Sequence, residues 1–192
     1  MIIKSKIFYE KEVKGKDFES DVFISCKFSN LNFRFTSFEN CDFKYCDFSG
    51  SVFDSIVFFR CTFPETKLSN LDFSGVSFRE CNFAGSVIEN SIFQQFKDAN
   101  KIIRKKFNLT SCKFENTNLT GSIFALCILD DINFKNSKLN NCVFEKCNLT
   151  QASLSTAEVV GVNFEGSKID RTALDINGFI NFGNSKGFIL GD

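Results

Sequence analysis

The sequence predicts an all-β solenoid, and three regularities support this fold class. An apolar residue recurs at every fifth position from Phe18 to Phe93, and the series resumes from Leu109 to Leu174, shifted by one residue. In most units the residue two positions earlier is small or of medium size, and all nine cysteines fall there. A period of five matches neither the 3.6 of a helix nor the 2 of a strand, and it is typical of a chain that stacks similar turns.

The repeating unit is clearest in residues 41–45 (CDFKY) and 46–50 (CDFSG). We expect the central Phe or Leu and the small residue two before it to point inward, and the other three positions to face solvent. Two inward positions in every five require the chain to turn a corner in each unit. The pattern provides 16 units, an interruption, and 14 further units.

The cysteine spacings indicate the length of one circuit. Cys41, Cys61 and Cys81 are separated by 20 residues, or four units, which predicts a four-sided coil with thiols stacked about 4.8 Å apart. Thiols inside such a wall should be reduced, inert and unable to converge on a zinc ion. The other cysteines in the same position are Cys26, Cys46, Cys112, Cys127, Cys142 and Cys147.

Units such as residues 81–85 (CNFAG) and 152–156 (ASLST) resemble the pentapeptide-repeat family, whose units follow the pattern A(D/N)LXX with Phe or Leu at the centre. The resemblance covers roughly residues 16–176. It implies a right-handed quadrilateral β-helix with a core of stacked Phe and Leu. A fold of this kind carries many functions, so the resemblance alone leaves the function open.

The phase of the repeat divides the chain into five segments. We predict an N-terminal cap strand at 1–15, a first repeat stack at 16–93, a basic insertion at 94–108, a second stack at 109–174, and a C-terminal cap at 175–192. The cap at 1–15 keeps the apolar phase but places lysine in the small inward position, where lysine is rarely buried unpaired. We therefore expect an extended strand that covers the open end of the first coil.

The insertion at 94–108 is the main candidate for partner contacts. It carries five basic residues and one acidic residue, and its apolar spacing favours a helix or a loop. Long insertions in solenoids often make the functional contacts, although a bulge with solvated charges is at least as plausible an interpretation. The partner-binding candidates are this segment's Phe96, Lys97, Lys101, Arg104 and Lys105, together with the outward aromatic residues Phe35 and Phe59.

The cap at 175–192 is rich in apolar residues. Asp175 is placed to cap a short helix, and Gly187 suits the position after its end, with Phe188 folding back. The segment is either a lid on the last coil or a surface for self-association. We favour a homodimer, a rod of roughly 70–80 Å at about 4.8 Å per coil, through a closed twofold contact. The expected interface residues are Phe179, Ile180, Phe182, Phe188 and Ile189.

Composition argues against catalysis and against several classes of partner. The chain has no histidine and no Gly-rich phosphate loop, so we predict no enzyme activity, no cofactor and no metal site. Its 23 basic and 23 acidic residues give a net charge of zero, which favours neither nucleic-acid nor membrane binding. Nine cysteines without a signal peptide predict a reducing, cytoplasmic location.

The sequence leaves two alternative functions open. Qnr-type, MfpA-like and toxin-immunity members of the family are rods of similar size that imitate duplex DNA, and the resemblance implies a partner such as DNA gyrase or topoisomerase IV and protection from quinolones or toxins. The alternative is a general interaction or scaffold module of unassigned function. No face of the first stack has a net charge beyond −2, and the basic insertion has the wrong sign for copying phosphates.

Overall fold

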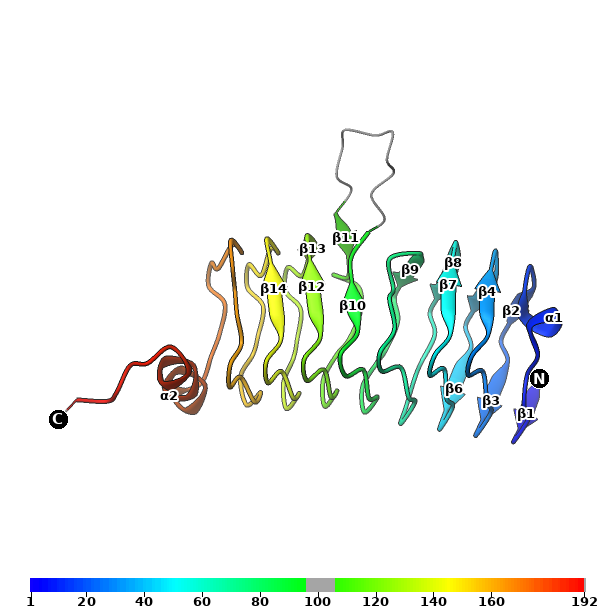
Figure 1. Ribbon diagram of the computed structural model, residues 1–192, viewed down its shortest axis with the longest axis horizontal. Helices are drawn as coiled ribbons and strands as arrows, with labels where there is room; N and C mark the ends of the chain where they lie inside the picture. Colours follow the sequence, from blue (N-terminus) through cyan, green and yellow to red (C-terminus); the bar gives the residue numbers. More distant parts are fainter. Residues whose placement is uncertain (96–105, 192) are drawn as a thin grey trace.

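The computed structural model describes residues 1–95 and 106–191. The chain is an all-β parallel solenoid of about seven turns, which confirms the predicted fold class. Figure 1 shows an elongated rod with the N-terminus at one end, helix α2 and the C-terminus at the other, and strands β10 and β11 midway along. The fifteen N-terminal residues belong to the first coil, and α2 covers part of the last.

The strands are short because each occupies one side of a coil. They are β1 Ile2–Lys4, β2 Asp17–Glu19, β3 Val22–Ile24, β4 Asn32–Arg34, β5 Ser37–Glu39, β6 Asp42–Lys44, β7 Val52–Asp54, β8 Ile56–Phe59, β9 Val76–Arg79, β10 Ile92–Phe93, β11 Phe107–Asn108, β12 Ile123–Ala125, β13 Cys127–Ile128 and β14 Val143–Glu145. Two helices accompany them, α1 Glu10–Val13 and α2 Ile176–Ser185.

The register confirms a coil of four units. Phe23 pairs with Phe43 in β3 and β6, and Phe33 pairs with Phe53 in β4 and β7, each exactly one circuit of 20 residues later in parallel alignment. Across the interruption Phe93 of β10 pairs with Phe124 of β12, so that one coil is longer. The circuit then returns to its usual length, because β12 pairs with β14 in the same register as before.

The core is a set of ring columns. Phe43 stacks on Phe63 with centroids 5.2 Å apart, and Phe63 stacks on Phe83 at 4.9 Å. Neighbouring rings of the same coil, such as Phe43 and Phe48, meet edge to face at 5.3 Å. Both arrangements are favourable for aromatic quadrupoles. The central residue of each unit points inward along the rod, as predicted. Only the ends depart from this pattern: Phe18 is half-buried and Ile169 is 51 % exposed.

The small inward position is a hydrogen-bonding position. The Sγ of Cys46 donates to the carbonyl of Phe23 at 3.4 Å, and the Sγ of Cys61 donates to that of Phe38 at 3.4 Å. The Oγ of Ser51 makes the equivalent bond to the carbonyl of Phe28 at 2.6 Å. All nine cysteines are buried free thiols, as predicted. Burial raises the pKa of Cys46, Cys112 and Cys142 to about 12.

The corners place one residue of most units at positive φ. Asparagine, serine and glycine are common there, since they tolerate this conformation. Gly50 has φ +70, and a Cβ on it would lie 2.4 Å from Oδ1 of Asn30 in the coil below. Phe35 and Tyr45 hold the same conformation, with φ of 52° and 57°. Bulky side chains adopt it at a cost.

The N-terminal segment differs from the single extended strand expected for 1–15. It forms β1, which pairs with β3, followed by the short helix α1. The Nζ of Lys6 bonds Oε1 of Glu12 at 2.9 Å and lies 4.5 Å from the centroid of the Phe8 ring. A helical turn brings the carboxylate to the lysine, which explains how a cation is tolerated in the small position. Val13 is fully buried behind it.

Candidate protein-interaction surfaces

The C-terminal helix is capped at both ends as the sequence predicts. The Asp175 carboxylate accepts from the backbone N–H of Gly178 at 2.7 Å. At the other end the N–H of Gly187 donates to Asn184 O, and the N–H of Phe188 donates to Gly183 O, both at 3.0 Å. This pair of bonds is a Schellman motif, and it turns the tail back along the helix.

Helix α2 covers only part of the last coil. The Phe182 ring lies 5.6 Å from the Phe164 ring, and a Cβ on Gly178 would be 3.0 Å from the Leu174 side chain. Ile169 of the same coil remains 51 % exposed. The helix therefore uses one face to seal the core and leaves apolar side chains on its other face.

The outer face of α2 and the tail form what we call the C-terminal apolar patch. Ile176, Phe179, Phe188, Ile189 and Leu190 are 62–90 % exposed. A shallow groove of about 220 Å³ runs between the helix and the tail, lined by Phe179, Ile180, Gly183, Asn184, Phe188, Ile189 and Leu190. Four of the five predicted interface residues line this groove, and the fifth, Phe182, instead packs on the last coil.

The predicted partner-binding aromatics are not gathered in one place. Phe35 is 61 % exposed at a corner just before β5, with the Arg34 guanidinium 5.0 Å from its ring centroid. Phe59 is half-buried at the far end of β8, with the Arg60 guanidinium 4.4 Å from its ring centroid. The other candidates, Phe96, Lys97, Lys101, Arg104 and Lys105, lie outside the described residues.

Two ion pairs between side chains bridge adjacent coils on the faces. Arg34 Nε lies 3.1 Å from Asp54, and Arg60 Nε lies 2.9 Å from Glu80, each pair bridging adjacent coils. All four side chains are about half exposed, so these pairs order the surface more than they stabilise it. Within residues 1–95 and 106–191, no group of three metal-ligating side chains is present. No described helix is long and apolar enough to cross a membrane.

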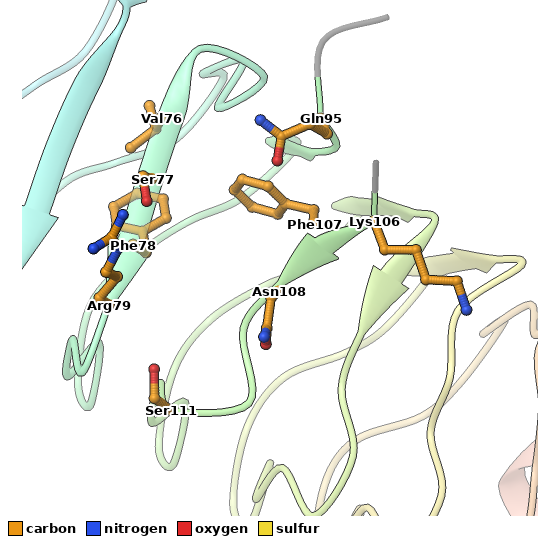
Figure 2. A pocket seen from close by; sticks show the side chains of 9 residues that line it. All are labelled: Val76, Ser77, Phe78, Arg79, Gln95, Lys106, Phe107, Asn108 and Ser111. Carbon is orange, nitrogen blue, oxygen red and sulfur yellow. The ribbon is translucent and has the colours of Figure 1, made fainter. Parts of the chain in front are cut away.

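A cavity that sequence analysis missed lies beside Gln95 and Lys106, where the repeat is interrupted. It has a volume of about 410 Å³ and lies between β9 and β11 (Figure 2), lined by Val76, Ser77, Phe78, Arg79, Gln95, Lys106, Phe107, Asn108 and Ser111. The phase slip in the sequence located the interruption along the chain. It did not indicate which side of the coil would open.

The comparisons with known proteins agree with this architecture. Residues 22–54 and 57–95 match a family model described as "Pentapeptide repeats (8 copies)". Residues 107–177 match a second family model, described as "Pentapeptide repeat region". The chain belongs to the pentapeptide-repeat family. None of the curated proteins matches it.

Solved structures with the same fold include QnrB1, a plasmid-mediated fluoroquinolone resistance protein. One trypsin-treated variant of QnrB1 aligns with a TM-score of 0.69 and 16 % identity over 99 % of this chain and 97 % of QnrB1. A second trypsin-treated variant aligns with a TM-score of 0.61 and 18 % identity over the same shares of the two chains. At 16–18 % identity, this likeness shows a shared fold and does not by itself indicate a shared function.

Proposed function

We propose that this protein is a non-enzymatic rod that binds a protein partner, and that the partner is a type II topoisomerase, DNA gyrase or topoisomerase IV, which the rod protects from a quinolone or a toxin. In this role the rod occupies the surface that otherwise holds duplex DNA. The protein would need no cofactor and no direct contact with nucleic acid, and it would act in the cytoplasm.

The observation that carries the proposal is the end-to-end likeness to QnrB1, which covers 99 % of this chain and 97 % of QnrB1. The two rods therefore share their length and fold as well as their repeat. QnrB1 is a fluoroquinolone resistance protein, and we infer the same role for this chain. The repeat core itself carries no such information, because the same inward Phe and Leu would serve any member of the family.

We further propose that two copies associate through the C-terminal apolar patch. A large aromatic side chain buries on the order of 150–250 Å². The five exposed apolar side chains of the patch therefore offer several hundred Å² of surface per protomer. A standard interface buries about 800 Å² on each side. In a twofold arrangement the tail of one protomer would fill the groove beside Phe179 of the other, and each would cover the other's exposed Phe188.

A supercoiling assay with purified gyrase and ciprofloxacin tests the topoisomerase proposal. Addition of the protein at micromolar concentration should raise the ciprofloxacin concentration that halves supercoiling by severalfold. The variant F188D should lose part of this effect if the dimer is the active form, and Ile2→Asp, an equal change at the opposite end, should retain it. An unchanged inhibition curve with the wild-type rod would exclude protection of that enzyme.

A second candidate function is a general scaffold module, and the paired charges favour it. The ion pairs Arg34–Asp54 and Arg60–Glu80 neutralise neighbouring coils, whereas a copy of DNA requires uncompensated negative charge along a face. Binding that is insensitive to salt would support the scaffold. Imitation of a polyanion should weaken steeply as ionic strength rises.

A further inference from the structure

The rod is split on one of its four sides. On the other three sides the coils before and after the interruption remain paired, through Asn82 with Lys113, Val87 with Asn118, and Ile92 with Ile123. On the fourth side β9 ends one sheet, of order β2-β5-β8-β9, and β11 begins another with β13. No pairing joins β9 to β11 among the residues that the structure describes.

The edge of β9 presents backbone groups to this split. The N–H of Arg60 donates to the carbonyl of Arg79 at 2.9 Å, so the backbone of Arg79 faces β8. Because backbone groups alternate along a strand, those of Phe78 and Val76 face the split. The next N–H along the chain, that of Glu80, donates to the Oγ of Ser111 at 3.0 Å. A side chain has thus replaced the carbonyl that would continue the ladder.

The edge of β11 presents its own groups from the other side. The N–H of Phe107 donates to the carbonyl of Leu126, and that of Leu109 donates to the carbonyl of Ile128, both at 3.1 Å. By the same alternation the backbone of Asn108 faces β9. The two edges therefore confront each other across the split without the ladder that joins the same two coils on the other three sides.

The cavity in the split follows the strand edge. The 410 Å³ cavity continues into a second one of about 390 Å³ along the start of β9, and the two share Val76, Ser77 and Gln95. The Phe107 ring points from β11 toward β9 in Figure 2, and its centroid is 6.5 Å from that of Phe78. The floor of the cavity is therefore aromatic, while its outer rim is polar.

The rim has a cation and, among the described residues that line the 410 Å³ cavity, no carboxylate. Arg79 lies exposed on the β9 side, and Ser77 lies beside it. Lys106 contributes to the lining, although its side chain points away from β9 in Figure 2. The second cavity includes Asp54, whose carboxylate lies 3.1 Å from Arg34.

We propose that the split between β9 and β11 is a docking slot for an extended acidic segment of a partner protein, which adds to the edge of β9 as a further strand. Strand addition to an unpaired edge takes its affinity from backbone hydrogen bonds and its specificity from alternate side chains. Inward side chains of the segment would contact Phe78 and Phe107, and outward carboxylates would reach Arg79. β9 offers four residues, about 13 Å of strand. The proposal does not depend on the partner being a topoisomerase.

The test uses the full chain and a fluorescein-labelled hexapeptide of alternating valine and glutamate, followed by fluorescence anisotropy. Saturable binding should be seen, and a peptide with N-methylated backbone amides should bind at least about tenfold more weakly, the loss expected for one or two hydrogen bonds. A valine–lysine hexapeptide should bind more weakly, because its lysine side chains would be repelled by Arg79.

Two charge reversals provide the matched pair of variants. R79E should weaken binding of the valine–glutamate peptide by roughly tenfold. Lys113→Glu makes the same change in charge on an exposed residue of the adjacent side, and it should alter binding by less than about twofold. Circular dichroism of both variants checks that the fold is retained.

Four results would overturn the proposal. The first is absence of saturable binding, and the second is equal binding of the N-methylated peptide. The third is binding that appears only after residues 96–105 are replaced by a short Gly-Ser linker, since the slot would then be the docking place of the chain's own segment. Equal losses in R79E and Lys113→Glu would reduce the interaction to long-range charge and would also reject the slot.

Discussion

The rings of Phe43 and Phe63 lie in successive coils with their planes 7° apart and their centroids separated by 5.2 Å. Both side chains are completely buried. The relationship repeats along the rod, because the central residue of each unit lies above that of the unit 20 residues earlier, or 31 residues earlier across the interruption, where Phe83 stacks with Phe114. Each ring is therefore held by two stacked neighbours and by edge contacts within its own coil.

Removal of one of these rings should be costly. Phe43→Ala or Phe63→Ala should lower the free energy of unfolding by about 3–5 kcal/mol, as for a large aromatic residue lost from a packed core. Tyr45→Ala, at an exposed corner next to Phe43, should change it by less than about 1 kcal/mol. Urea unfolding followed by circular dichroism measures both. Losses well under 1 kcal/mol at both core sites would contradict the packing described here.

The buried thiols should make stability depend on alkaline pH. Burial raises the pKa of Cys46, Cys112 and Cys142 from 9.0 to about 12, so the folded state holds these protons more tightly than the unfolded state. Their stabilisation is complete below about pH 9 and is lost as the pH rises toward about 12. The difference in unfolding free energy between wild type and the triple alanine variant, measured from pH 8 to pH 11, isolates this effect from other titrating groups.

Chemical labelling provides an independent check on the same thiols. All nine cysteines should react slowly with iodoacetamide in the native protein at pH 8, and rapidly in urea, because burial keeps the reagent away from the thiols. Rapid native labelling of Cys41, Cys61 and Cys81 would mean that the small position faces outward.

The corner residue Phe35 should be replaceable with a gain in stability. Its φ of 52° is unfavourable for an aromatic residue, and its side chain is largely exposed. Phe35→Asn should therefore raise the free energy of unfolding by up to about 1 kcal/mol. Asn40 has the same φ of 52°, and the reverse change Asn40→Phe should lower it by a similar amount. A loss of stability in F35N would show that the contact with Arg34 outweighs the backbone strain.

The C-terminal apolar patch should determine the oligomeric state. Sedimentation velocity at micromolar concentration should give a species of twice the 21.8 kDa chain mass. The double variant F188D/I189D should be monomeric, since each carboxylate would be buried in the twofold contact. Ile2→Asp, at an apolar residue 66 % exposed at the opposite end, should remain dimeric. A wild-type protein that sediments as a monomer would reject the dimer.

The repeat made the coil, the core and the buried thiols predictable, because one large apolar inward residue and one small inward residue recur in most units. The caps of α2 were predictable as well, since Asp175 and Gly187 are placed where a helix begins and ends. The ends of the repeat were harder: the turn of α1 depends on the ion pair of Lys6 with Glu12, which periodicity does not reveal.

The candidate interaction surfaces were harder to predict from the sequence. Phe35 and Phe59 were both predicted to point outward, yet Phe35 lies at the corner before β5 and Phe59 at the end of β8, so they do not form one site. The split beside β9 results from how the chain re-enters the coil at Phe107, and the phase slip only marks its place in the sequence. Exposure of Phe188 depends on the Schellman turn, whereas Phe182 of the same segment is used to cover Phe164.

The side-chain bonds of the small position have a direction along the chain. Cys46 donates to Phe23, Ser51 to Phe28 and Ser91 to Leu68, each to a carbonyl 23 residues earlier, and across the interruption Cys127 donates to Phe93, 34 residues earlier. For these side-chain bonds, each coil therefore finds its acceptors already in place when it emerges during synthesis, and a rod shortened from its C-terminus loses only their donors. A rod shortened from its N-terminus instead keeps buried hydroxyls and thiols with no acceptor, so the two ends of this protein differ in how well they tolerate truncation.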